Sequence, residues 1–427
     1  MYSMGVKTLL EERKCRGSVV ELGNLSREYE VTRYAYMYRE NTLVFRVNNS
    51  EVVCYSNLIS SRRDLYSFLN AKNDKEAYTK LLNSIKKPRR LDTMPFSEYF
   101  ERVDFSLLDI PFIKYFREDG GYYLTGSIVI ACIEEFCNAS FHRMMYVDQD
   151  KAAIRIVPRH LYFIYSKYRA MGRDLPVAVV LGVDPAVEIA AASSAPLGVF
   201  ELEVAAAISG DDKVVKTPLY NIPVPAHSSI VLEGVISHDE FVDEGPFTDI
   251  IGLLDEKRRQ PVFKLEAVYA NVDGLFYHAI VPSFPEHVYL MGFPREAQIY
   301  DFVKNIAPTV RSVRLTPGSG GWLHAVISMK QHKPGEARSI GIAVINAHPS
   351  VKHVIVVDED IDVDNPLMIE WALATRVKGS EDIIVLKGLR GSTLDPRSSD
   401  GYGDKVIVDA TKPFDEPWTK YRRVRIP

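Results

Sequence analysis

The sequence contains 427 residues, enough for roughly two or three domains. Hydrophobic residues make up 46% and charged residues 25% of the chain, a composition typical of globular proteins with a packed core. The net charge of −4 and the pI near 6.2 argue against a nucleic-acid-binding protein, because such proteins usually carry a basic surplus.

The first third of the chain has mixed helix and strand signals. Its start, MYSMGVKTLLEERKC, becomes charged too soon for a signal peptide. Residues 42–47 and 51–55 are strand-like and flank Asn48-Asn49-Ser50, which predicts a hairpin. Asn73 and Glu76 have capping-box spacing before a helical pattern that ends at residues 86–90, KKPRR. We interpret this run as a solvated linker rather than a nucleic-acid patch, and residues 1–108 as an α/β domain.

The middle of the chain, residues 109–300, is richer in strands. Short apolar segments at 176–181, 229–232 and 262–269 are separated by turn residues, which favours a barrel or sandwich-like domain. The longest apolar region, residues 186–208, contains Pro196 and three glutamates, so we expect no membrane span there.

The last part, residues 301–427, has the alternating pattern of an α/β domain. Residues 353–357 and 382–386 predict strands. Between them, Asn365 predicts a helix N-cap with Pro366 at the first helical position.

The four cysteines, Cys15, Cys54, Cys132 and Cys137, form no CxxC pair, which argues against a zinc ribbon or a thioredoxin-type site. Their small number also argues against a disulfide framework and favours a reducing compartment. We therefore expect a cytoplasmic protein in which Cys132 and Cys137 are packed thiols.

The segment DEGPFTDIIG, residues 243–252, carries two carboxylates, Glu244 and Asp249. In a regular strand they would face opposite sides, but Gly245 and Pro246 favour a turn or bulge that brings both to one side of a cavity. Two close carboxylates raise each other's proton affinity, so one of them becomes a proton donor near neutral pH. The alternative is an exposed acidic turn.

Two further segments contain groups suited to binding. In NASFHRMMYVDQDKAAIRIVPRH, Arg143 has the guanidinium that binds a carboxylate, while His160 is either a metal ligand or a core histidine. In SSAPLGVFELE, Glu201 and Glu203 stand at the start of an apolar helix, 204–208. The helix dipole favours acidic residues in that first turn.

Together, these segments resemble one family, the UbiD-like decarboxylases, which use prenylated FMN. The resemblance extends over roughly residues 120–413 and includes NASFHRM, LPVAVVLGVDPA, VPAHSSIVLEG, EGPFTDIIG, VIVVDEDIDV, WALATR and DGYGDKVIVDATK in one consistent order. It implies a three-part fold of mixed α/β class: an N-terminal α/β domain (1–108), a central split β-barrel that binds the flavin (109–300), and a C-terminal α/β domain with oligomer contacts (301–427).

The resemblance also implies residue roles. Arg143, Glu244 and Asp249 match the catalytic set, in which Arg143 binds the substrate carboxylate, Glu244 holds Arg143, and Asp249 returns a proton. Asn138, His160 and Glu201 match the positions that hold a metal against the cofactor phosphate, and this ligand set suits Mn²⁺ or Mg²⁺; K⁺ is a further candidate ion. The other residues expected at the cofactor are Thr125, Arg159, Ser193, Ser194, Pro196 and Lys405. Lys405 would reach the flavin from the C-terminal domain.

The reaction implied is a reversible, non-oxidative decarboxylation. Within the family, SFHRMM and AIRIVPRHL resemble the short archaeal branch that converts trans-anhydromevalonate 5-phosphate into isopentenyl phosphate. An aromatic acid such as a hydroxybenzoate is the alternative substrate. Readings of other classes are a flavin reductase-like oxidoreductase, a non-catalytic subunit and a metal enzyme without flavin.

The expected partners follow from this reading. The chain would act on a small carboxylic acid, would depend on a flavin prenyltransferase for its cofactor, and would form a homo-oligomer, a dimer or a hexamer. We expect no nucleic-acid or membrane partner.

Overall fold

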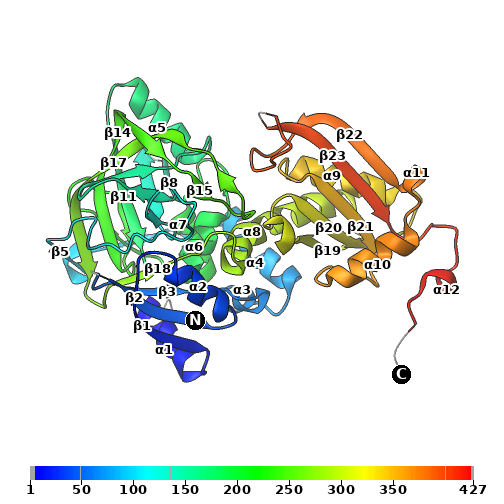
Figure 1. The fold of residues 1–427 in the computed structure, drawn as a ribbon, viewed down its shortest axis with the longest axis horizontal. Helices are drawn as coiled ribbons and strands as arrows, with labels where there is room; N and C mark the ends of the chain where they lie inside the picture. The colour runs from blue at the N-terminus through cyan, green and yellow to red at the C-terminus, as the bar shows by residue number, and fades with distance from the viewer. Residues whose placement is uncertain (1–4, 49, 135, 400, 425–427) are drawn as a thin grey trace. The chain divides into compact units, whose positions relative to one another are not determined.

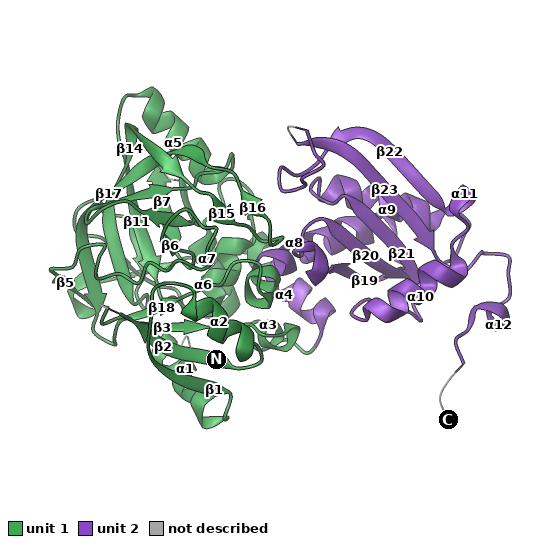
Figure 2. Cartoon of the chain, viewed as in Figure 1, with its two compact units in different colours: residues 1–72, 83–290 green, residues 73–82, 291–427 purple. Residues whose placement is uncertain are grey.

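The computed structural model describes residues 5–48, 50–134, 136–399 and 401–424. The chain divides into two compact units, residues 1–72 with 83–290 and residues 73–82 with 291–427 (Figure 2). The segments expected as N-terminal and central domains thus lie mostly in the first unit, which ends ten residues before the expected boundary at 300. The division into three domains stays a prediction.

The first unit is built on a nine-stranded sheet with the order β6-β9-β10-β17-β14-β11-β7-β8, in which β5 pairs with β17 (Figure 1). Its strands are β5 (Phe100–Val103), β6 (Tyr123–Leu124), β7 (Ile128–Ile133), β8 (Phe136–Phe141), β9 (Met144–Tyr146), β10 (Lys151–Ile154), β11 (Leu175–Leu181), β14 (Ile230–Glu244) and β17 (Arg258–Asn271). Among the described residues, no pairing closes β6 onto β8, so the sheet is open, as in a split barrel.

The long antiparallel pair β14 and β17 forms the centre of this sheet. The first eight residues of β14 are buried, and its second half becomes more exposed before ending at the buried Glu244. Burial of these eight residues anchors the strand in the core, so the sheet holds Glu244 in a fixed position at the end of a central strand. The strands expected at 176–181, 229–232 and 262–269 are confirmed as parts of β11, β14 and β17.

Smaller sheets complete the first unit. The expected hairpin is confirmed as the antiparallel pair of β2 and β3, which joins two further strands in the order β1-β2-β3-β18. The strands of these sheets are β1 (Val19–Leu25), β2 (Thr42–Val47), β3 (Val53–Ser56), β18 (Phe276–His278), β4 (Asp92–Met94), β12 (Lys213–Lys216), β13 (Pro223–Pro225), β15 (Phe247–Thr248) and β16 (Leu254–Asp255).

The second unit contains a five-stranded sheet with the order β19-β20-β21-β23-β22. Its strands are β19 (Val310–Leu315), β20 (His324–Met329), β21 (His353–Asp358), β22 (Ile383–Arg390) and β23 (Tyr402–Ala410). Helix α9 (Glu336–Ala347) packs closely on β23 at Gly341. A Cβ at this position would come within 2.4 Å of Ile407 Cγ2, so only glycine fits there. The expected N-cap is confirmed: Asn365 Oδ1 accepts from the Leu367 N–H at the start of α10 (Pro366–Arg376).

The remaining helices are α1 (Val6–Cys15), α2 (Glu30–Met37), α3 (Arg62–Phe68), α4 (Asp74–Lys86), α5 (His160–Ala170), α6 (Pro185–Ala192), α7 (Glu201–Ser209), α8 (Pro285–Ile306), α11 (Gly379–Asp382) and α12 (Trp418–Tyr421). The expected cap of α4 is confirmed, since Asn73 Oδ1 accepts from the Glu76 N–H at 3.0 Å. Within the described residues, none of these helices combines the length and the apolar character that crossing a membrane requires.

Candidate active site

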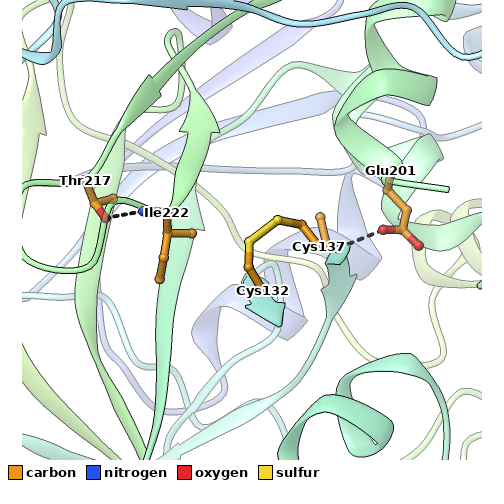
Figure 3. Close-up of a disulfide and its surroundings, with 6 residues drawn as sticks. Cys132, Cys137, Glu201, Thr217 and Ile222 are labelled. Atoms are coloured by element: carbon orange, nitrogen blue, oxygen red, sulfur yellow. Dashed lines mark hydrogen bonds between the residues drawn. A yellow bond between two sulfur atoms is a disulfide. The ribbon is translucent and has the colours of Figure 1, made fainter. Parts of the chain in front are cut away.

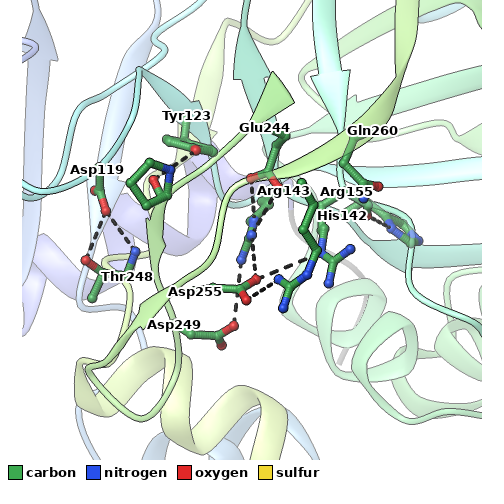
Figure 4. Close-up of polar contacts among 12 residues, drawn as sticks. Asp119, Tyr123, His142, Arg143, Arg155, Glu244, Thr248, Asp249, Asp255 and Gln260 are labelled. Atoms are coloured by element: carbon green, nitrogen blue, oxygen red, sulfur yellow. Dashed lines mark hydrogen bonds and ion pairs between the residues drawn. The ribbon is translucent and has the colours of Figure 1, made fainter. Parts of the chain in front are cut away.

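Arg143 lies at the centre of a cluster of carboxylates (Figure 4). Its Nε donates to Glu244 Oε1 at 2.8 Å and its Nη2 donates to Glu244 Oε2 at 3.1 Å. Nη1 lies 3.7 Å from Asp249 Oδ2, and Nη2 also donates to Asp255 Oδ2 at 2.9 Å. The structure thus brings together Arg143, Glu244 and Asp249, the three residues expected to be catalytic.

Backbone geometry explains how Glu244 and Asp249 reach the same arginine. Glu244 ends β14, and the following Gly245 has φ +97° and a cis peptide bond to Pro246. The chain then forms β15, and Asp119 Oδ1 accepts hydrogen bonds from the Thr248 N–H at 2.8 Å and the Thr248 hydroxyl at 2.9 Å. The turn expected at Gly245-Pro246 is therefore confirmed, and both carboxylates face Arg143 rather than opposite sides of a strand.

Packing confines the arginine further. The Arg143 guanidinium lies over the Phe247 ring at 4.4 Å from the centroid, a cation–π arrangement. Burial alone would lower the pKa of Arg143, but Glu244 and the two aspartates raise it above the ordinary value, so the group is permanently charged. A fixed guanidinium with few competing water contacts is suited to binding a carboxylate.

Asp249 has the opposite electrostatic character. Burial raises its pKa above the ordinary value, although the charge of Arg143 and the hydrogen bond from the Ile250 N–H act against this rise. Asp249 therefore holds its proton to a higher pH than an exposed aspartate, which is the property of a general acid.

Three residues of this cluster were not predicted from the sequence: Arg155, Asp255 and Arg258. Asp255 accepts from Arg143, pairs with Arg258 Nη1, and lies 4.0 Å from Arg155 Nε. Asp255 and Arg258 lie in the charged run of LLDEKRRQ, residues 253–260, and Arg155 lies in AIRIVPRH, but neither spacing nor periodicity connects these segments with Arg143.

A second cluster contains the residues expected to bind a metal. Asn138 lies in β8, whereas His160 and Glu201 begin α5 and α7. Asn138 Nδ2 donates to Glu201 Oε1 at 3.0 Å, and His160 Nδ1 lies 3.9 Å from the same oxygen. The Ala139 N–H donates to Glu201 Oε2 at 2.8 Å, which fixes the buried carboxylate.

This cluster fits the metal and phosphate that the family resemblance implies. An amide, an imidazole and a carboxylate are ligands suited to Mn²⁺ or Mg²⁺, and the starts of two helices favour a phosphate group. Burial lowers the pKa of the nearby His142 to about 4, so this ring is neutral at physiological pH. It contacts Ser140 Oγ at 3.0 Å, and Ser140 donates to Asn138 Oδ1 at 2.9 Å, a chain that orients the Asn138 amide.

The other residues expected at the cofactor do not form a single cluster. Arg159 Nη1 lies 3.4 Å from Ser194 Oγ, so these two meet beside His160. Ser193 Oγ donates to the Ala190 carbonyl, Pro196 is exposed, and Thr125 lies against Tyr115 and Tyr277. Lys405 belongs to the second unit, where its ammonium donates to the carbonyls of Pro349 and Val351.

One expectation about the cysteines is wrong. Cys132 and Cys137 form a disulfide instead of remaining packed thiols (Figure 3). They are directly opposite each other in the antiparallel register of β7 and β8, with Cα atoms 4.0 Å apart, and Asn138 follows the second cysteine. A spacing of five residues predicts this disulfide only when the two cysteines are already known to lie in a tight hairpin. The cytoplasmic location stays a prediction.

The sequence is similar to known carboxy-lyases over most of its length. Residues 89–285 match the 3-octaprenyl-4-hydroxybenzoate carboxy-lyase Rift-related domain, and residues 288–410 match the corresponding C-terminal domain. The anhydromevalonate phosphate decarboxylase of Aeropyrum pernix is 44% identical, over 100% of this chain and 97% of the relative. The enzyme of that name from Methanosarcina mazei is 40% identical over 96% of each.

A solved structure confirms the fold. The UbiD-class enzyme HmfF from Pelotomaculum thermopropionicum, in complex with FMN, superposes with a TM-score of 0.95 at 31% identity, covering 99% of this chain and 98% of that one. An evolved dimeric form of HmfF, in complex with prenylated FMN, has a TM-score of 0.90 at 29% identity, covering 99% and 97%. The domain matches, the full-length relatives and the three-dimensional likeness agree: the chain belongs to the UbiD family of carboxy-lyases.

Proposed function

We propose that this chain decarboxylates trans-anhydromevalonate 5-phosphate to isopentenyl phosphate with the help of prenylated FMN. The observation that carries the proposal is the buried Arg143–Glu244 pair with Asp249, an aspartate of raised pKa, on the remaining side of the guanidinium. The substrate assignment is supported by full-length relatives at 44% and 40% identity that act on anhydromevalonate phosphate.

In this proposal Arg143 binds and orients the substrate carboxylate. Glu244 occupies the Nε side of the guanidinium, so its Nη1 side is directed away from Glu244 and toward Asp249. A carboxylate bound there lies next to the proton donor, and the two-pronged contact fixes its plane.

The proton balance of the reaction involves Asp249. The bond between the carboxyl carbon and the α-carbon breaks, and CO₂ leaves. Asp249 then delivers its proton to the α-carbon, and water afterwards reprotonates Asp249. Prenylated FMN, when bound, supplies the electron sink that makes this bond cleavage accessible. No net oxidation occurs, and carboxylation at high CO₂ is the reverse of the same steps.

We also propose that Asn138, His160 and Glu201 hold Mn²⁺ or Mg²⁺ against the cofactor phosphate, with K⁺ as a further ion. The support is the convergence of the Asn138 and His160 side chains on Glu201 Oε1. Thr125, Arg159, Ser193, Ser194, Pro196 and Lys405 are proposed to surround the cofactor. A flavin prenyltransferase would supply it, and a homo-oligomer, dimer or hexamer, is the proposed assembly.

The experiment that tests the proposal is co-expression with a flavin prenyltransferase, followed by the mass of the released cofactor and a CO₂-release assay. A prenylated FMN mass together with CO₂ from trans-anhydromevalonate 5-phosphate supports it. CO₂ release from a hydroxybenzoate alone would favour the aromatic-acid alternative. NAD(P)H oxidation without CO₂ would indicate the reductase reading, and loaded enzyme without either activity would indicate the non-catalytic one.

A further inference from the structure

Asp255 is a carboxylate shared by three guanidinium groups. Its Oδ2 accepts from Arg143 Nη2 at 2.9 Å and lies 4.0 Å from Arg155 Nε, while its Oδ1 pairs with Arg258 Nη1. The side chain is 14% exposed, and Figure 4 shows its contacts with Arg143 and Arg155. The hairpin of β15 and β16 holds it there, since Asp255 is the register partner of Phe247.

The position of Asp255 conflicts with substrate binding at Arg143. Glu244 accepts from Nε and from one hydrogen of Nη2, and Asp255 accepts from Nη2 as well. A substrate carboxylate that binds in two-pronged fashion to the outer edge needs hydrogens from both Nη1 and Nη2. Asp255 and the substrate therefore compete for the same Nη2 hydrogen.

Arg155 and Arg258 make this competition reversible. If Asp255 had only Arg143 as a partner, displacing it would leave a largely buried carboxylate uncompensated, which is costly. With two further guanidinium groups at its oxygens, Asp255 keeps charge-assisted partners after it leaves Nη2. The same carboxylate also offsets the repulsion among the three cations: burial lowers the pKa of Arg155, Arg143 and Arg258 lower it further, and Asp255 acts in the opposite direction.

We propose that Asp255 is a positioning residue that occupies the outer edge of Arg143 in the free enzyme and transfers to Arg155 and Arg258 when the substrate carboxylate binds. This inference rests on the proposed function, because it needs a carboxylate substrate at Arg143. It assigns the charged segment 255–258 a role in substrate affinity rather than in the chemical step.

The test compares D255N, R258Q and the D255N/R258Q double variant as enzymes loaded with prenylated FMN. D255N removes the competing charge and should lower KM for trans-anhydromevalonate 5-phosphate by roughly threefold to tenfold. In R258Q, Asp255 loses one alternative partner and pairs more strongly with Arg143, which should raise KM. Because Arg258 acts through Asp255, the double variant should behave like D255N. A residue with a merely structural role would raise KM and lower kcat in D255N.

The matched control is D243N. Asp243 is an exposed carboxylate that pairs with Lys257 at 3.0 Å and lies 3.9 Å from Arg259 Nη1, so it has a similar cationic setting on the surface. Its removal should leave KM unchanged. A substrate analogue with a saturated carbon–carbon bond in place of the double bond is not turned over. Its dissociation constants for the wild-type enzyme and the variants, measured by calorimetry, should follow the same order as their KM values.

The outcomes separate the two proposals. Wild-type turnover with an unchanged or higher KM in D255N overturns the role of Asp255 and leaves the proposed function intact. If D255N fails to fold, a KM of R258Q at or below the wild-type value overturns it equally. If the loaded wild-type enzyme neither turns over the substrate nor binds the saturated analogue, the proposed function fails, and this inference fails with it.

Discussion

Arg143 and Glu244 form a two-pronged pair, with distances of 2.8 Å and 3.1 Å, in which the glutamate side chain has no exposed surface. The pair joins the end of the central strand β14 to the segment just after β8, and the two residues are 101 positions apart in the sequence. Removing one partner of a buried ion pair leaves the other uncompensated, which typically costs about 3–5 kcal/mol. Each partner therefore keeps the buried charge of the other compensated, and in the proposed function the pair also fixes the guanidinium that binds the substrate.

The first prediction concerns E244Q. The amide keeps the size of the side chain but not its charge, so the free energy of unfolding should fall by about 3 kcal/mol and kcat/KM by roughly 100-fold or more. Denaturant unfolding and steady-state assays measure the two effects. The control is E240Q, because Glu240 forms its ion pairs with Lys151 and Lys264 at a solvent-accessible position. Equal effects of E244Q and E240Q would contradict the role of the buried Arg143–Glu244 pair.

The second prediction concerns the pH dependence of kcat. Burial raises the pKa of Asp249, Asp255 adds to this rise, and Arg143, Arg155 and the Ile250 N–H oppose it. Protonated Asp249 is the active form, so kcat should be full below this pKa and fall as pH rises through it. D249N should lose about 10²–10⁴-fold in kcat and should lack this limb, while still binding the saturated analogue. A pH–rate profile of D249N identical to the wild-type profile would contradict the assignment.

The third prediction concerns the metal cluster. E201Q removes the carboxylate shared by Asn138 and His160, so purified enzyme should contain at least about tenfold less Mn²⁺ and correspondingly less flavin. Metal analysis and absorbance measure both quantities. The control is E203Q, two residues further along the first turn of α7, which should retain metal and flavin. Similar metal content in both variants would exclude Glu201 as a ligand.

The fourth prediction concerns stability. His278 is fully buried, with Nδ1 at 2.7 Å from Glu188 and Nε2 at 2.8 Å from Glu286. Burial alone would lower its pKa, but the two glutamates raise it from 6.5 to about 10. Because the folded-state pKa is raised, the stability from this ion is complete below pH 6.5 and is lost as pH rises through about 10.

The H278Q variant tests this directly. Wild-type melting temperature should decline between pH 6.5 and 10, whereas H278Q should melt lower at pH 6.5 and show a smaller decline. H238Q is the control, because His238 pairs with Asp174 near the surface, and it should follow the wild-type pH dependence. Parallel curves for wild type and H278Q would contradict the buried charge.

Much of the fold followed from local pattern. The hairpin at 42–56, the Asn365 cap and the apolar strands near 177, 231 and 265 have signals within a few residues, and the structure contains each of them. The meeting of Glu244 and Asp249 at one arginine was also accessible, because a Gly-Pro turn interrupts the strand between them.

The rest depended on contacts that local pattern does not encode. Asp255 reaches Arg143 only because β15 and β16 fold back after the Gly245-Pro246 turn, and each strand has just two residues. The Cys132–Cys137 bond depends on the register of β7 and β8, which one residue of slippage would destroy. Neither pairing has a periodic signal that the sequence alone would reveal.

In the proposed mechanism, Arg143, Glu244 and Asp249 decarboxylate trans-anhydromevalonate 5-phosphate. The most direct measurement is phosphorus and proton NMR of the reaction in D₂O with enzyme carrying prenylated FMN. We expect isopentenyl phosphate with one deuterium at its terminal methylene carbon, and conversion by D249N that is slower by about 10²–10⁴-fold. Folded, loaded wild-type enzyme that leaves the substrate unchanged, or D249N that forms product at the wild-type rate, would contradict the proposed mechanism.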